Sequence, residues 1–326
     1  MSMHARILGQ RRVLPEWAVA LGAGILFLAG ASANGQEGLR VEADQSAVVF
    51  KLGDKPLAKY QYVENPAKPY LAELYSPGGA SVLRDSPIDH KHHHGLMFAV
   101  AVDGVDFWAE GDKFGRQKHR EGEEPQVIER DGRSWGVGTQ KIDWVAPPND
   151  KLLLRETRTM VVGRLTDSNA TLVGGQLVLE TPPGKDSVTL TGSPYFGLGM
   201  RFVQSMDKEG SLLNADGKTG VAGTNDARSA WCAYSAVADG KPVTVAMFDL
   251  PQNPPHPATW FTMDQGFAYM AATLNLSKEP LKIEAGKPLV LRYAVAVWDG
   301  KVEKAKIDQL YQRIVKWSAG AKGAGG

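Results

Sequence analysis

The chain has 326 residues, of which 43% are hydrophobic and 22% are charged, and its formal net charge is +1. This is an ordinary globular composition, sufficient for one large β domain or two smaller ones. The near balance of charge gives no electrostatic reason to expect nucleic acid or an anionic membrane as a partner.

The first 33 residues have the pattern of a signal peptide. Three arginines within the first 12 positions precede an apolar run over residues 17–29, and Ala31-Ser32-Ala33 forms an A-x-A cleavage site. A retained membrane anchor is the alternative, but the apolar run is shorter than the ~20 residues that a spanning helix needs. We therefore expect cleavage after Ala33 and a mature protein in the periplasm or outside the cell, with no stable membrane insertion.

Short apolar or alternating runs, separated by Gly, Pro, Asn and Asp, predict strands along most of the remaining chain. The runs cover residues 48–52, 57–63, 70–75, 96–102, 127–130, 134–144, 151–162, 172–180, 187–191, 198–203, 230–237, 243–248, 260–263, 267–274 and 289–298. In residues 151–162 one face is largely polar, which predicts a sheet with a wet side.

Three other segments complete the predicted architecture. Residues 113–124 are highly charged and predict an exposed loop carrying His119. Residues 302–317 place apolar side chains at helical spacing, and residues 319–326 form a flexible tail. We therefore expect an all-β fold over residues 34–318, a single large antiparallel β-sandwich with one C-terminal helix. A closed barrel is the alternative.

Several common catalytic motifs do not occur in the sequence. It has no phosphate-binding glycine loop, no G-x-S-x-G, no H-E-x-x-H and no C-x-x-C. This argues against nucleotide-dependent transfer, serine hydrolysis and zincin proteolysis. Cys232 is the only cysteine, so an internal disulfide is excluded, and a buried small apolar residue is expected at that position.

Four of the seven histidines, His90, His92, His93 and His94, precede the apolar run at residues 96–102. They are therefore expected on a loop at the mouth of a core strand, where binding and catalytic residues concentrate. In one interpretation His90, His92 and His93 hold a divalent transition metal such as Zn²⁺, Cu²⁺ or Fe²⁺. In the other, His92 and His93 transfer protons with Glu110 as the catalytic carboxylate.

An aromatic ring beside a carboxylate is a common way to hold a sugar, and Trp108 lies two residues before Glu110. The alternative for Trp108 is an aromatic core anchor. The other candidate ligand-binding residues are Arg84, Asp89, Asp226, Arg228 and His256. His256 lies on a proline-rich loop that could face the first histidines or serve only as a stiff connection. For the Arg–Asp pairs at both loops, a buried structural pair is the alternative, and Arg201, within a strand, is expected to be buried with a partner acid.

Several motifs resemble those of an exported bacterial family labelled "methane oxygenase PmoA family". They are Tyr75-Ser-Pro-Gly-Gly, His90-Lys-His-His-His-Gly, Gly104-Val-Asp-Phe-Trp-Ala-Glu-Gly, Gly217-Lys-Thr-Gly, Asp249-Leu-Pro-Gln-Asn-Pro-Pro-His-Pro and Leu291-Arg-Tyr-Ala-Val-Ala-Val-Trp-Asp-Gly. His94 stands where that family usually has an arginine, so its role stays open. The resemblance implies a β-rich fold similar to the galactose-mutarotase-like sandwiches of carbohydrate-active proteins.

Three hypotheses follow. The first is an exported protein that binds a small-molecule or oligosaccharide ligand and transforms it as an epimerase, lyase or hydrolase. The second is a metal-dependent oxidoreductase or metal-binding protein that uses the same histidines. The third is a sugar-binding module without catalytic activity.

Overall fold

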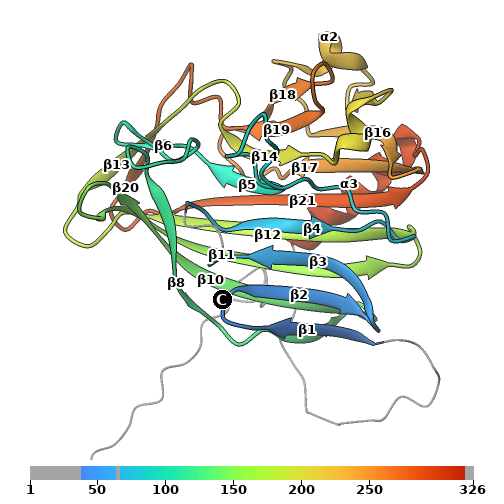
Figure 1. The fold of residues 1–326 in the computed structure, drawn as a ribbon, viewed down its shortest axis with the longest axis horizontal. Coiled ribbons are helices and arrows are strands. Elements are labelled where there is room, and N and C mark those ends of the chain that lie inside the picture. Colours follow the sequence, from blue (N-terminus) through green and yellow to red (C-terminus); the bar gives the residue numbers. More distant parts are fainter. Residues whose placement is uncertain (1–37, 64–66, 320–326) are drawn as a thin grey trace, which may run out of the picture.

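A computed structural model of the chain describes residues 38–63 and 67–319, in which antiparallel sheets dominate (Figure 1). The all-β sandwich predicted from the sequence is confirmed. The predicted signal peptide and nearly all of the predicted tail lie outside the described residues. Within the described ranges, no helix is long and apolar enough to cross a membrane.

Two large sheets and one small sheet make up the fold. The eight-stranded sheet has the order β1 (Leu39–Ala43), β2 (Ala47–Leu52), β3 (Lys55–Gln61), β4 (Tyr70–Leu74), β5 (Leu96–Ala99), β14 (Gly197–Arg201), β19 (Tyr269–Thr273) and β18 (Thr259–Met263). The nine-stranded sheet has the order β15 (Ser211–Asn214), β16 (Trp231–Ala238), β17 (Lys241–Asp249), β21 (Leu289–Asp299), β12 (Ala170–Glu180), β11 (Lys151–Leu165), β10 (Arg133–Ala146) and β8 (Arg116–Gly122), and β9 (Gln126–Arg130) also pairs with β10. The four-stranded sheet has the order β20 (Leu281–Glu284), β13 (Ser187–Thr191), β6 (Ala101–Val102) and β7 (Val105–Asp106).

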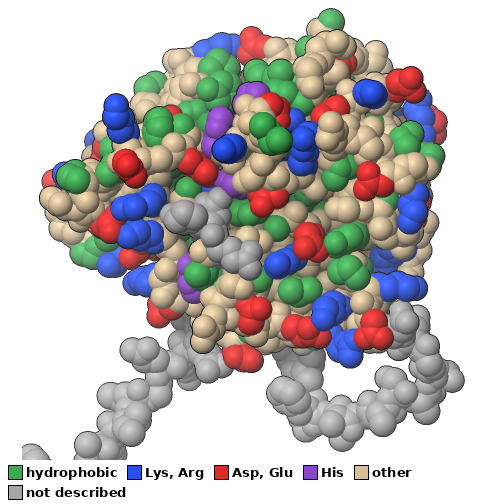
Figure 2. Space-filling view, viewed as in Figure 1, with side chains coloured by type: hydrophobic (Ala, Val, Ile, Leu, Met, Phe, Trp, Pro, Cys, Tyr) green, Lys and Arg blue, Asp and Glu red, His purple; other side chains and the backbone are tan. Residues whose placement is uncertain are grey.

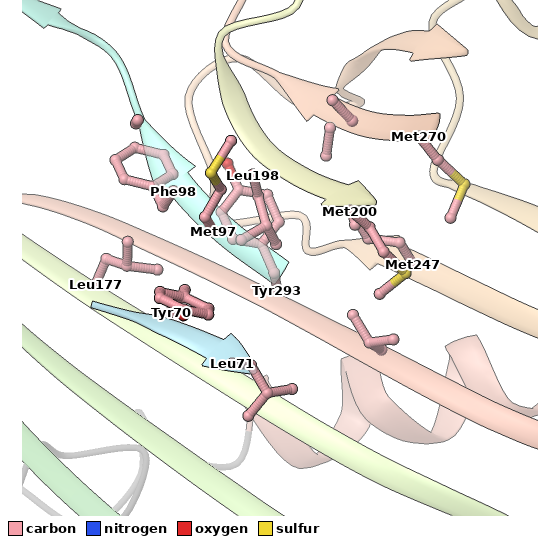
Figure 3. Close-up of a cluster of buried hydrophobic side chains, with 14 of the residues drawn as sticks. Tyr70, Leu71, Met97, Phe98, Leu177, Leu198, Met200, Met247, Met270 and Tyr293 are labelled. Carbon is pink, nitrogen blue, oxygen red and sulfur yellow. The ribbon is translucent and has the colours of Figure 1, made fainter. Parts of the chain in front are cut away.

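The main core contains side chains from both large sheets. Figure 3 shows Leu198 and Met200 of β14 close to Met247 of β17 and Tyr293 of β21. Each fully buried side chain of this size stabilises the fold by roughly 1.5–3 kcal/mol. Because these strands are distant in sequence, the core joins the ends of the chain to its middle.

Within residues 38–63 and 67–319, helical structure is confined to a 3₁₀ turn, η1 (Gln204–Asp207), a short helix, α2 (Gly220–Thr224), and α3 (Lys304–Ala319). In α3, Ile307, Leu310 and Ile314 repeat at helical spacing and are buried in a second core with Phe248 and Trp298 of the nine-stranded sheet. The predicted C-terminal helix is therefore confirmed, two residues further along the chain.

Two predictions about local structure were wrong. The predicted loop at residues 113–124 contains β8, a charged strand at the edge of its sheet, where charged side chains prevent further pairing. The predicted strand at residues 96–102 is two strands, β5 and β6, which belong to different sheets. The predicted wet face of β11 is partly exposed, since Arg155 and Thr157 are half-buried and Leu153 and Thr159 are buried. On the opposite face, Arg158 forms a buried ion pair with Glu156.

The connection from β4 to β5 carries the first group of histidines, and we call its residues 85–95 the histidine loop. The amide of Ser86 donates to the carbonyl of His93, which closes the loop on itself. Arg201 of β14 donates its amide to the carbonyl of Gly95, which fixes the loop against the eight-stranded sheet. Gly95 has φ +39°, and a Cβ there would lie 2.1 Å from the carbonyl oxygen of Leu71.

Replacing Gly95 by alanine should therefore destabilise the protein by more than ~2 kcal/mol, because backbone strain and a clash act together. Gly79→Ala is the matched control, since Gly79 also has a positive φ (+79°) but nothing lies within 4 Å of its Cβ position. Urea unfolding of both variants measures the difference. Equal losses of stability would show that the contact with Leu71 does not constrain the loop.

Candidate functional site

His94 is the most deeply buried residue of the histidine loop, with 1% of its surface exposed. Its Nδ1 lies 2.6 Å from Asp85 Oδ1, and its Nε2 lies 2.7 Å from Glu110 Oε1. Burial lowers the pKa of His94, but the hydrogen bonds to both carboxylates outweigh this effect and raise it. Since an ionised carboxylate only accepts hydrogen bonds, His94 donates from both nitrogens and is an imidazolium.

A buried lysine completes this arrangement. Lys68 donates from Nζ to Glu110 Oε1 at 2.8 Å and to the carbonyl oxygen of Trp108 at 2.8 Å. Burial raises the pKa of Glu110, but the hydrogen bond from His94 and the charge of Lys68 lower it to about 2. We call Lys68, Asp85, His94 and Glu110 the ion network. Glu110 within it suits the role of a fixed anion better than that of a group exchanging protons near neutral pH.

His93 lies in a contrasting environment of aromatic rings. Its ring stacks on His90 with centroids 4.6 Å apart, and the ring of Tyr269 lies 5.2 Å away. Burial and the neighbouring His92 and His90 lower the pKa of His93 to about 3, so the ring is neutral. His93 is therefore neutral, whereas the next residue, His94, carries a positive charge. The pKa of half-buried His92 is also lowered, by burial and by the charge of Lys68.

Buried polar atoms without a hydrogen-bond partner gather around His93. Within the described part of the chain they are His93 Nδ1, Trp108 Nε1, the Tyr269 hydroxyl, and Nε and Nη1 of Arg201. Each such group costs roughly 1–3 kcal/mol, so a cluster of them calls for a ligand, ordered water or a catalytic role. Gly199 leaves room for the Tyr269 hydroxyl, because a Cβ at position 199 would lie 1.8 Å from the hydroxyl oxygen.

Trp108 does not offer the sugar platform expected from the sequence. It is 2% exposed and stacks on Phe196, with ring centroids 5.2 Å apart and planes 13° apart. Because packing covers the ring, Trp108 is an aromatic core anchor, which was the alternative prediction. Its buried Nε1 has no hydrogen-bond partner among the described residues, and its Cη2 lies 3.1 Å from the Cβ position of Gly199, beside the Tyr269 hydroxyl.

Arg84 and Asp89 both lie at the histidine loop. Arg201 donates from Nη2 to Asp89 Oδ2 at 3.0 Å, and its guanidinium carbon lies 3.7 Å from the ring centroid of Phe267. Burial raises the pKa of Asp89, but His90 and Arg201 lower it to about 2. Arg84 Nη1 lies 3.5 Å from Asp207 Oδ2. The expectation that Arg201 is buried with a partner acid is confirmed.

Asp226, Arg228 and His256 form a separate group. His256 Nδ1 lies 2.7 Å from Asp249 Oδ2, Arg228 donates to the carbonyl of His256 at 2.9 Å, and exposed Asp226 pairs with Lys278 at 2.8 Å. These contacts fix the loops that carry Asp226, Arg228 and His256.

The strand register separates this group from the histidine loop. Arg228 bridges to Thr259 at the start of β18, whereas Met263 at its other end pairs with Tyr269, which pairs with Arg201. Four residue steps of a strand span roughly 13 Å, and β19 also intervenes. Of the two alternatives for the loop carrying His256, the register favours the stiff connection over a loop that faces the first histidines.

The predicted metal ligands His90, His92 and His93 do not converge. His90 and His93 stack with their planes 22° apart, and Nδ1 of His90 lies 3.0 Å from Asp89 Oδ2. Nitrogen lone pairs lie in the ring plane, so stacked rings cannot both direct them at one ion about 2.0–2.1 Å away. Among the described residues, no three His, Cys, Asp or Glu side chains are placed to hold a metal ion.

Residues that sequence reasoning did not assign complete the site. Lys68 comes from the β3–β4 connection, Tyr269 begins β19, and Phe267 precedes it. No local motif marks them, and only strand pairing brings them to the histidine loop. Histidine side chains reach the surface on the face shown in Figure 2, where they appear in purple.

Comparison with known proteins gives a family and partial structural likenesses. Residues 47–312 match a family described as "Family of unknown function (DUF6807)". No curated protein matches the chain. Among solved structures, an α-galactosidase from Lactobacillus brevis is similar over 84% of this chain and 42% of its own, with 5% identity and a TM-score of 0.47. A GH36 α-galactosidase from Geobacillus stearothermophilus is similar over 79% of this chain and 40% of its own, with 11% identity and a TM-score of 0.41. This chain thus spans less than half the length of either enzyme, and likeness at this level carries no argument about function.

The ion network predicts a specific acid sensitivity. The pKa of Glu110 is about 2 when folded and 4.5 ordinarily, so its stabilisation is complete above about pH 4.5 and is lost as the pH falls toward 2. Glu110→Gln should lower the free energy of unfolding at pH 7 by on the order of 2 kcal/mol, allowing for partial exposure, and the deficit should shrink on acidification. Urea unfolding at pH 7, 5 and 3.5 measures this. Glu124→Gln, at an exposed position, is the control, and a pH-independent deficit would contradict the account.

The donor geometry also predicts the metal content. Protein purified without an affinity tag should carry far less than one equivalent of Zn, Cu or Fe by elemental analysis. Addition of these ions should not raise the melting temperature more than in a His92→Ala His93→Ala double variant. One tightly bound equivalent, lost in the double variant, would instead support the metal-dependent hypothesis.

Proposed function

The chain belongs to the DUF6807 family, whose function is unknown, and we propose that it is an exported protein that binds and transforms a carbohydrate at the histidine loop. One observation carries the proposal. Buried polar atoms without partners lie against half-buried aromatic rings, and both surround a neutral histidine.

A sugar matches this arrangement chemically. Its hydroxyl groups both donate and accept hydrogen bonds, and its C–H faces pack on aromatic rings. His93 Nδ1, the Tyr269 hydroxyl and Trp108 Nε1 supply the polar contacts. Phe267 and His92, both half-buried, supply ring surface that a ligand can reach.

Proton transfer is assigned to His92 rather than to Glu110. His92 is half-buried, and its lowered pKa keeps the ring neutral at neutral pH, so it can accept a proton from the ligand. Epimerisation, elimination and hydrolysis all need such a group. The ion network holds the loop that presents it. Export is proposed from the signal-peptide pattern in residues 1–33.

The resemblance to the PmoA-like family stays a prediction. It supports an oxidoreductase only with a bound metal, which the elemental analysis above tests. The sugar-binding module without catalysis differs from the main proposal in a single respect, the absence of turnover.

Calorimetry with a panel of methyl glycosides and oligosaccharides tests the proposal, with product analysis for any saccharide that binds. His93→Ala should weaken binding about tenfold or more, because it removes a buried hydrogen bond. His92→Ala should change affinity by only about threefold but reduce turnover about a hundredfold or more.

His119→Ala is the matched control, since His119 contacts Tyr62 and Gln140 rather than the site. Unchanged binding in His93→Ala, or no saccharide bound by the wild-type protein, would refute the proposal. Binding with no turnover in the wild-type protein would leave the non-catalytic module.

A further inference from the structure

Arg201 is buried without being fully satisfied. Only 1% of it is exposed, yet Nε and Nη1 have no hydrogen-bond partner among the described residues. Burying a charge is costly unless it is paired and hydrogen-bonded. In the part of the chain that the structure describes, its side chain donates to Asp89 alone, through Nη2 at 3.0 Å.

Arg158 shows how this fold satisfies a buried arginine. Its guanidinium donates to both carboxylate oxygens of Glu156, to the Tyr60 hydroxyl, to the Pro69 carbonyl and to Gln117 Oε1. All three of its nitrogens have partners, and Glu156 is itself buried. Among the described residues, Arg130 and Arg155 each have one buried nitrogen without a partner, but both are half-buried, whereas Arg201 is buried and has two such nitrogens.

The one anion that Arg201 binds is replaceable. The Asp89 side chain is 44% exposed and belongs to the histidine loop rather than to a strand. Its other hydrogen-bonded side chain is its chain neighbour His90. Solvent therefore reaches the Asp89 side chain, although the Arg201 guanidinium is covered.

A second arginine lies close by and is also loosely paired. Arg84 Nη1 stands 3.5 Å from Asp207 Oδ2, beyond the usual hydrogen-bond distance, and its charge acts on Arg201. Planar carboxylates match the fork of a guanidinium group and can accept two parallel hydrogen bonds from it.

We infer that the carbohydrate bound at the histidine loop is acidic, and that its carboxylate takes the place of Asp89 on Arg201. The inference rests on the proposed function and adds the class of ligand, a uronic acid or its glycoside. The sugar ring then lies against Phe267, the half-buried ring that the Arg201 guanidinium contacts.

Paired probes test the inference. Methyl glucuronide and methyl galacturonide should bind about tenfold or more tightly than methyl glucoside and methyl galactoside, because a hydrogen bond to a charged group contributes roughly 1.5–3 kcal/mol. Asp89→Asn removes the competing carboxylate and should raise the ratio of uronide to glycoside affinity a further threefold or more. Arg201→Gln should bring that ratio close to one.

Asp226→Asn is the matched control, because Asp226 is an exposed, ion-paired aspartate outside the site, and the ratio should not change. Circular dichroism checks that Arg201→Gln folds. If it does not, the comparison of Asp89→Asn with Asp226→Asn decides.

The outcomes separate the two proposals. Equal binding of uronides and neutral glycosides, or the same ratio in Asp89→Asn and Asp226→Asn, would overturn the acidic ligand while leaving carbohydrate binding intact. Failure of every saccharide, neutral or acidic, to bind would refute the proposed function itself.

Discussion

The imidazolium of His94, held between the carboxylates of Asp85 and Glu110, is the interaction on which the site depends. It joins the start of the histidine loop to its end and to the segment after β7. Lys68 adds a second positive charge, so that the four charges of the ion network sum to zero. Removing any one of the four charges would leave an uncompensated charge in a poorly solvated place, which is strongly destabilising.

The ion network explains why two neighbouring histidines, His93 and His94, differ in charge. His94 turns inward to the carboxylates and is charged, whereas His93 turns to the rings of His90 and Tyr269 and is neutral. The same short loop therefore supplies both a structural cation and a neutral imidazole. His92, on the solvent side of the pair, is the histidine that suits proton transfer.

Local patterns in the sequence predicted much of the fold. The alternation in residues 187–191 gave the bounds of β13, and the apolar run after the histidines placed them at the mouth of β5. Strand β8 was missed because a charged edge strand resembles an exposed loop. In residues 96–102, no local signal marks the change from one sheet to another.

The candidate site was harder to predict because non-local pairing assembles it. Arg201 and Tyr269 reach the histidine loop only through the order β5–β14–β19, and Lys68 through the β3–β4 connection. The sequence leaves the role of His94 open, because its partner Glu110 lies sixteen positions later in the chain. Trp108 was assigned from a motif that does not show which face of the ring is covered.

The most direct test of this account is the protonation state of the neighbouring histidines. Long-range ¹H–¹⁵N correlation spectra of histidine-labelled protein at pH 7, assigned with single variants, report it for each ring. The account predicts His94 protonated on both nitrogens and His93 neutral. A neutral His94, or a charged His93, would contradict the ion network and the site that rests on it.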